Sequence, residues 1–162
     1  MTEYLWSPWR IEYIKGPHDD TACIFCEKPA AGDDETNLIL ARNEHAFVLL
    51  NAYPYNPGHV MVAPFRHTGD LESLSADEWR DTDLLLKESV RVLRQGEGPH
   101  GFNLGMNLSR TAGAGIPDHL HFHVVPRWNG DTNFMPVLGE VKVIGEHLEA
   151  TLAKLREGLA AG

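Results

Sequence analysis

The stretch Asp118-His-Leu-His-Phe-His-Val-Val-Pro-Arg127 decides how this sequence is interpreted. Its three histidines alternate with Leu, Phe and Val, and residues two apart in a β-strand lie on the same face. The pattern therefore predicts a strand that buries the apolar residues and turns three imidazoles outward together, about 6.6 Å apart. A helix would scatter the same histidines at intervals of about 200°, so the strand is favoured.

Three imidazoles on one face, those of His119, His121 and His123, indicate metal ligation, phosphate chemistry or both. The residues alone leave two other interpretations open. One is a polar strand face that merely carries histidines. The other is a catalytic zinc held by three histidines, which requires an open ligand position for water.

The composition is that of a soluble globular protein of single-domain length. The chain has 162 residues, of which 43% are hydrophobic and 23% are charged. It contains no apolar run of membrane-spanning length, and its N-terminus has neither a basic region nor an apolar signal core. We therefore expect a cytoplasmic protein that does not enter a membrane. The net charge of −9 opposes nonspecific binding to nucleic acid, although a site locally lined with donors can still bind an anionic nucleotide.

Short apolar segments separated by turn residues predict the strands of an antiparallel sheet. Besides the histidine stretch, these segments are residues 37–41, 46–50, 60–63 and 101–108. The first two form a hairpin pattern joined at Asn43-Glu44. Before the third, Asn56-Pro57-Gly58 fits a type II turn, with Pro at the second position and Gly at the third.

Two helices are predicted to cover this sheet. Ser75-Ala-Asp-Glu78 is a capping box, which begins a helix that runs to about Gln95 and ends at Gly96. Its predicted apolar stripe consists of Trp79, Leu86, Val90 and Leu93. A second stripe at helical spacing predicts a C-terminal helix through Ile144, Leu148, Leu152, Leu155 and Leu159. The predicted fold class is α+β, with an arm over residues 1–22 and a single domain over 23–162.

The two cysteines, Cys23 and Cys26, form a Cys-x-x-Cys pair. In a cytoplasmic chain such a pair favours metal or redox chemistry over a structural disulfide. A thioredoxin-like site needs the pair after a strand in a βαβ unit, which this sequence does not supply. A zinc half-site needs two further ligands, so the pair alone leaves metal, redox and free thiols open.

The histidine stretch, with a Gly-rich loop before it and Pro-Arg after it, resembles the histidine triad (HIT) nucleotide hydrolases and transferases. The resemblance runs from about Cys23 to Phe134 and includes residues 51–59, 60–67 and 101–128. Within this family, Leu5-Trp-Ser-Pro-Trp-Arg10 and Trp128-Asn-Gly-Asp-Thr-Asn-Phe134 look most similar to the bacterial diadenosine tetraphosphate phosphorylases. The family resemblance also implies a homodimer.

The resemblance implies that the catalytic set is the triad of His119, His121 and His123, with His121 as the nucleophile. A largely neutral imidazole at pH 7 can attack an α-phosphorus and form a nucleotidyl-histidine, provided that its other ring nitrogen donates to a fixed acceptor. We expect that acceptor to be a backbone carbonyl. His123 and His59 match positions that donate to phosphate oxygens in the family.

Other positions match the family's substrate-binding residues. Asn51 matches the residue that holds the ribose hydroxyls, and Asn107 matches an amide that contacts phosphate. The loop residues Gly113, Ala114 and Gly115 lack bulk, which lets phosphate approach the backbone.

The loop also departs from the family pattern. Many members have Gln-Ser or Gly-Ser at the positions of Ala114 and Gly115, so this chain lacks a side-chain donor there. Backbone N–H groups, Ser109 or Thr111 must replace it. Arg110 or Arg127 is expected to supply charge for a second phosphate.

The resemblance also completes the metal set. Some bacterial histidine triad proteins combine a Cys-x-x-Cys pair with two histidines, at the positions of His67 and His119 here. Together with Cys23 and Cys26 these would form a closed, structural Cys₂His₂ zinc site, leaving His121 free for chemistry.

The sequence therefore predicts an enzyme that cleaves an adenine nucleotide at the α-phosphorus, with a dinucleoside polyphosphate such as diadenosine tetraphosphate as the expected substrate. A nucleotidyl-His121 intermediate would be resolved by phosphate or water. The alternatives are an adenosine phosphoramidase, a dinucleoside polyphosphate hydrolase, a slow nucleotide-binding sensor, and an inactive zinc-ribbon adaptor.

Overall fold

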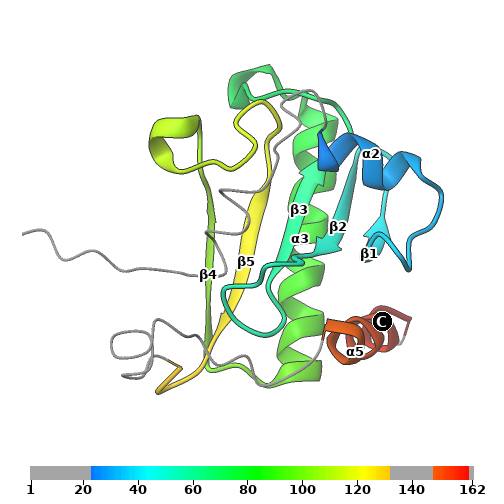
Figure 1. Ribbon diagram of the computed structural model, residues 1–162, viewed down its shortest axis with the longest axis vertical. Coiled ribbons are helices and arrows are strands. Elements are labelled where there is room, and N and C mark those ends of the chain that lie inside the picture. Colours follow the sequence, from blue (N-terminus) through cyan, green and yellow to red (C-terminus); the bar gives the residue numbers. More distant parts are fainter. Residues whose placement is uncertain (1–22, 132–147, 161–162) are drawn as a thin grey trace, which may run out of the picture.

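The computed structural model describes residues 23–131 and 148–160, and within them the chain forms a five-stranded sheet (Figure 1). Neighbouring strands are all antiparallel, in the order β1-β2-β3-β5-β4. The strands are β1 Ile39–Arg42, β2 Ala46–Leu50, β3 Val60–Pro64, β4 Gly101–Met106 and β5 Phe122–Arg127. The helices are α2 Ile24–Ala30, α3 Ala76–Glu97 and α5 Leu148–Ala160, with short 3₁₀ turns η1 Leu71–Ser73 and η2 Arg110–Ala112. The predicted α+β class is confirmed.

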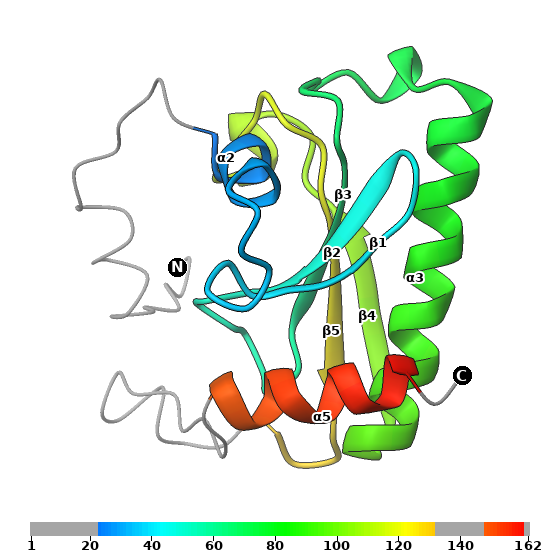
Figure 2. The same cartoon turned by 90° about the vertical axis from the view of Figure 1, so that its right-hand side faces the viewer.

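Helices cover both faces of the sheet. Figure 2 shows α3 along one face with α5 crossing its lower end, and α2 on the opposite face. Alternation along β2 and β3 sends Val48 and Val62 toward α3, whereas Leu49 and Met61 join Phe25 of α2 on the other side. Every residue of β2 and β3 is buried as a result.

The histidine stretch differs from its prediction in two ways. The ladder of β5 begins only at Phe122, so His119 and His121 lie in the segment just before the strand. The imidazoles also do not point to solvent, since His119 is 1% and His121 is 5% exposed. The alternation of side chains was predicted correctly, but the sequence did not reveal that α2 covers the histidine face.

The long helix α3 begins at the predicted capping box. Ser75 Oγ accepts from the Glu78 backbone N–H, and the Glu78 carboxylate accepts from the Ser75 N–H. The helix passes Gly96 and ends at Gly98, whose φ of +57° suits a left-handed C-cap. The predicted stripe was partly wrong. Leu93 is buried, and Leu86 and Val90 pack partly buried against the core, as predicted. Trp79 is instead 45% exposed, and Leu85 and Val92 complete the apolar face of the helix.

The turn before β3 has the predicted form. The His59 N–H donates to the Asn56 carbonyl at 3.1 Å, and Gly58 has φ +74°. A Cβ on Gly58 would also lie 2.9 Å from Leu93 Cδ2 of α3. Both the backbone angle and the packing therefore require glycine.

Some predictions lie outside the described residues. These are the arm over 1–22, the segment 132–134 and Ile144 of the C-terminal stripe. Within the described part, α5 buries Leu152 and Leu155 as predicted. No helix there is both long and apolar enough to cross a bilayer.

Candidate active site and metal centre

A cavity of about 340 Å³ lies on the α2 side of the sheet. Its floor follows a row of paired residues across the strands, in which His123 pairs with Met61 and Met61 pairs with Leu49. The remaining lining residues are Ile24, Phe25, Lys28, Leu50, Asn51, Ala52, Tyr53, Tyr55, Gly113, Gly115, Ile116 and His121. A mostly apolar cavity with a few convergent polar groups is typical of a small-molecule site.

His121 meets the cavity with one defined nitrogen. Its Nδ1 lies 2.8 Å from the His119 carbonyl oxygen, and since a carbonyl can only accept, Nδ1 carries the proton. The lone pair is therefore on Nε2. Burial lowers the pKa of His121, which keeps the ring neutral, and Phe25 stacks on it with centroids 4.6 Å apart. The expected backbone carbonyl acceptor is confirmed.

His123 is oriented by a chain of hydrogen bonds. The Tyr55 backbone N–H donates to His59 Nδ1 at 3.1 Å, so the proton of a neutral His59 ring lies on Nε2. That N–H donates to His123 Nδ1 at 3.0 Å and leaves the His123 proton on its own Nε2. His59 is 0% exposed and is not part of the cavity wall. The structure therefore places His59 behind His123 and not at the expected phosphate contact.

Only some of the substrate-binding residues predicted from the sequence line the cavity. Asn51, Gly113 and Gly115 line the cavity. Asn107 instead donates from Nδ2 to the Gly113 carbonyl at 3.4 Å, which braces the loop, and Ala114 is buried away from the cavity wall. Gly113 has φ +91°, a conformation that glycine adopts without strain.

Of the two arginines considered for a second phosphate, Arg127 is engaged elsewhere. It lies at the far end of β5, where its guanidinium donates to both Asp131 carboxylate oxygens at 2.6 and 2.9 Å. It also donates to Asn103 at 2.7 Å. Arg110 is exposed in the loop before the histidines, which leaves it as the remaining candidate.

Four predicted ligands converge into one cluster, formed by Cys23, Cys26, His67 and His119. The two Nδ1 atoms lie 3.3 Å apart, and Cys26 Sγ lies 3.4 and 3.5 Å from those of His67 and His119. Tetrahedral zinc, with bonds of about 2.05 Å to N and about 2.3 Å to S, requires N···N near 3.3 Å and S···N near 3.6 Å. These separations match a tetrahedral ion, and all four donor atoms lie within 4.8 Å of one another.

His119 has the tautomer that a metal ligand needs. Its Nε2 donates to the Pro64 carbonyl at 2.8 Å, so Nδ1 presents its lone pair to the cluster. Burial lowers the pKa of His119 to about 4, with a further contribution from the neighbouring histidines. Without a cation, burial and the adjacent Cys23 raise the pKa of the Cys26 thiol to about 11, so a thiolate there needs a positive ion beside it.

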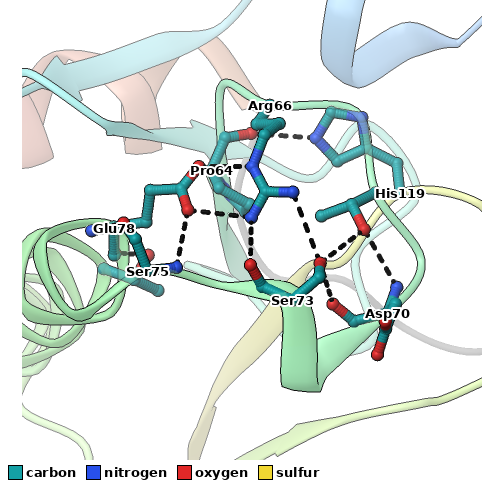
Figure 3. Close-up of polar contacts among 9 residues, drawn as sticks. Pro64, Arg66, Asp70, Ser73, Ser75, Glu78 and His119 are labelled. Carbon is teal, nitrogen blue, oxygen red and sulfur yellow. Dashed lines mark hydrogen bonds and ion pairs between the residues drawn. The ribbon is translucent and has the colours of Figure 1, made fainter.

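A salt bridge between Arg66 and Glu78 holds the loop between β3 and α3 (Figure 3). His67 belongs to this loop. Arg66 donates to both Glu78 carboxylate oxygens at 2.6 and 2.8 Å and to the Ser73 carbonyl at 2.7 Å. These bonds and the Ser75 N–H lower the pKa of Glu78 to about 2. Arg66 directly precedes the ligand His67 and lies two residues after Pro64, whose carbonyl accepts from His119, so the capping box of α3 anchors that side of the cluster.

The sequence did not point to several residues of the cavity wall. Phe25 lies inside the Cys-x-x-Cys pair, which was considered only for its thiols, and Lys28 is one helical turn after Ile24. Ile24, Phe25 and Lys28 share one face of a short helix, and this spacing was the signal that could have identified them. Tyr55 was also missed, because its role depends on a backbone N–H and not on its side chain.

Comparisons with known proteins place the chain in a family. The model of the HIT domain matches residues 33–130. An AP-4-A phosphorylase of Mycobacterium tuberculosis is 41% identical over 155 residues, covering 91% of this chain and 79% of the relative. An adenosine 5'-monophosphoramidase of Schizosaccharomyces pombe is 28% identical, covering 81% of this chain and 98% of that protein.

Solved structures agree with this placement. A zinc-bound histidine triad family protein from Mycobacterium smegmatis superimposes with a TM-score of 0.70 at 25% identity, over 88% of this chain and 96% of that one. The chain belongs to the HIT domain family. The resemblance inferred from the sequence is confirmed, and with it the general class of a nucleotide phosphorylase or hydrolase.

Proposed function

We propose that this enzyme transfers a nucleotidyl group from a dinucleoside polyphosphate to His121 and then to phosphate or water. The observation that carries the proposal is the tautomer of His121: its Nδ1–H is held by the His119 carbonyl, so Nε2 presents a lone pair in a cavity large enough for a nucleotide. The ring starts neutral and ends as an imidazolium whose Nδ1–H bond to that carbonyl strengthens.

In the first step, Nε2 of His121 attacks the α-phosphorus, a P–N bond forms and the bond from phosphorus to the bridging oxygen breaks. The leaving polyphosphate departs with that oxygen. His123, with its proton on Nε2, can donate to the bridging oxygen or to a non-bridging phosphoryl oxygen as negative charge develops. In the second step an oxygen of phosphate or water attacks the same phosphorus, and the P–N bond breaks.

The rest of the cavity suits the nucleoside. Asn51 lines the cavity and can hold ribose hydroxyls. Gly113 and Gly115 line the same cavity as His121 and His123, so N–H groups of the loop can take the place of the absent side-chain donor. We propose zinc for the cluster of two cysteines and two histidines, as a structural ion closed by four protein ligands.

The 41% identical relative named AP-4-A phosphorylase supports diadenosine tetraphosphate as the substrate and phosphate as the acceptor. Product analysis tests both. Phosphorolysis gives ADP and ATP, whereas hydrolysis gives AMP and ATP, so the ADP to AMP ratio with and without millimolar phosphate identifies the acceptor. We expect ADP to predominate with phosphate present. A ratio unaffected by phosphate would make the enzyme a hydrolase, and no cleavage at all would refute the proposed substrate.

A phosphoramidase is the second candidate, because the relative from S. pombe carries that name. The same His121 attack would then break a P–N bond of adenosine 5'-phosphoramidate. Comparing kcat/KM for this compound and for diadenosine tetraphosphate separates the two. The homodimer and the cytoplasmic location expected from the sequence stay predictions, which sedimentation and cell fractionation can test.

A further inference from the structure

The apolar wall of the cavity contains one lysine. Ile24, Phe25 and Lys28 of α2 all line the cavity, so the lysine stem continues the apolar face of the helix. Among the described lining residues, Lys28 is the only lysine, arginine, aspartate or glutamate, and burial lowers the pKa of its ammonium group. Its Nζ has a 3.4 Å hydrogen bond to the Asn37 carbonyl, which leaves other N–H groups of the ammonium available to a ligand.

The hydrogen bond to Asn37 ties the Lys28 amine to the segment just before β1, and β1 is three strands away from β5 in the sheet. The paired row that begins at His123 continues through Met61 and Leu49 to Ile39 of β1. Three strand spacings separate its ends by about 14 Å, which is close to the length of a nucleoside monophosphate. Asn37, the partner of Lys28, stands two residues before Ile39. With the phosphate at His121 and the ribose at Asn51, the base lies beside Lys28.

An ammonium group constrains which base edge can lie there, because it only donates hydrogen bonds. Guanine and hypoxanthine present two adjacent acceptors, O6 and N7, whereas adenine presents N7 beside an amino group that donates. A base acceptor buried against apolar side chains loses water, so a matching donor strongly favours it.

We propose that Lys28 reads the base and that the enzyme accepts 6-oxopurine nucleotides at least as well as adenine nucleotides. This inference rests on the proposed function, since it takes the histidine end as the phosphate end. It extends the substrate class from diadenosine to diguanosine polyphosphates. In the competing structural role, the Lys28 stem only fills the wall and its amine only anchors Asn37.

The test compares diguanosine and diadenosine tetraphosphate in three variants. Lys28→Met keeps the apolar stem and removes the donor, Lys28→Arg keeps a donor, and Lys87→Met is the control on an exposed face of α3. In the wild type we expect kcat/KM for the guanine substrate to equal or exceed that for the adenine substrate. In Lys28→Met the guanine to adenine ratio should fall about tenfold or more, the size of one lost charge-assisted hydrogen bond. Lys28→Arg should retain more than half of the logarithm of the wild-type guanine to adenine ratio of kcat/KM. Lys87→Met should retain the whole wild-type ratio.

A wild type that strongly prefers adenine, or a Lys28→Met variant that loses both substrates equally, would overturn the inference. If neither substrate is cleaved, the proposed function fails on its own. Equilibrium titration of the same variants with GMP and AMP then decides about Lys28, since base recognition requires no turnover. If the ratio of GMP affinity to AMP affinity is the same in Lys28→Met and in the wild type, Lys28 does not recognise the base.

Discussion

The metal cluster and the nucleotide cavity use two histidines that are only two residues apart, and they use opposite nitrogens. His119 donates from Nε2 to the Pro64 carbonyl and turns Nδ1 to the cysteines. His121 donates from Nδ1 to the His119 carbonyl and keeps Nε2 for the cavity. Both rings are buried, and burial lowers the pKa of both. The backbone carbonyl that each ring contacts, and not the residue type, decides between ligand and nucleophile.

The two regions also meet in one residue. The carbonyl that orients His121 belongs to His119, so a residue of the metal cluster holds the candidate nucleophile. Phe25 contacts both rings, at centroid distances of 5.2 Å from His119 and 4.6 Å from His121. We therefore expect damage to the cluster to lower stability first and to disturb His121 as well, whereas replacing His121 itself should affect chemistry alone.

The largest expected effect is on the cavity side. His121→Asn should lower kcat by at least about 10⁴-fold, because asparagine cannot act as the nucleophile. Affinity for AMP should change by less than about tenfold, since the rest of the cavity stays intact. Turnover assays measure kcat, and calorimetric titration measures the affinity for AMP. Trapping an acid-labile nucleotidyl adduct on the wild-type protein tests the role of His121 directly. Wild-type rates in the variant would remove His121 from the mechanism.

On the cluster side, Cys23→Ser should cost stability. Zinc bound by four protein ligands contributes folding free energy directly, so we expect a Tm lower by on the order of 10 °C. Elemental analysis should find about one zinc per wild-type chain and less in the variant. The matched control is a chelator, which should lower Tm in the wild type but hardly in Cys23→Ser. Purified wild-type protein without zinc would contradict this proposal.

A mutation behind the cavity should have an intermediate effect. His59→Phe fills similar space but cannot donate to His123, whose ring loses its fixed orientation. We expect kcat to fall by roughly 10–100-fold with zinc content unchanged. His100→Phe, at an exposed histidine outside the cavity, serves as the control. An unchanged kcat in His59→Phe would show that His123 needs no such support.

The smallest effect concerns the anchor of the loop that carries His67. The pKa of Glu78 is about 2 in the folded protein, below its ordinary value of 4.5, so its carboxylate stabilises the fold above pH 4.5. This contribution is lost as the pH falls from 4.5 toward 2. Because the partner Arg66 is half-exposed, we expect about 1–2 kcal/mol.

Glu78→Gln should therefore be less stable than the wild type at pH 7, and the difference should shrink toward pH 2. Denaturant unfolding of chelator-treated protein at several pH values measures it without interference from metal release. Glu78→Gln should also release zinc to a chelator faster than the wild type, because the salt bridge anchors the loop that carries His67. The control for this is Glu88→Gln, which removes a similar pair with Arg91 further along α3. If both variants release zinc to a chelator at the same rate, Arg66 and Glu78 have no special role at the cluster.

Local patterns predicted most of the secondary structure. The capping box at Ser75, the Asn-Pro-Gly turn and the alternating histidines depend on neighbours within a few residues, and each is present. The end of α3 was placed two residues early, because Gly96 and Gly98 both fit a C-cap in the sequence. Trp79 was assigned to the core because apolar spacing cannot show which residues the sheet covers.

The sequence by itself determined the chemistry that is available: three alternating histidines, a Cys-x-x-Cys pair and a loop without bulk. Only the tertiary structure decided how that chemistry is divided. The contact between Cys23 and His119 joins residues 96 positions apart, and Lys28 reaches the cavity because α2 covers the sheet. The placement of His59 behind His123 depends likewise on the pairing of β3 with β5. Such contacts are set by the packing of whole elements, which short-range sequence patterns do not contain.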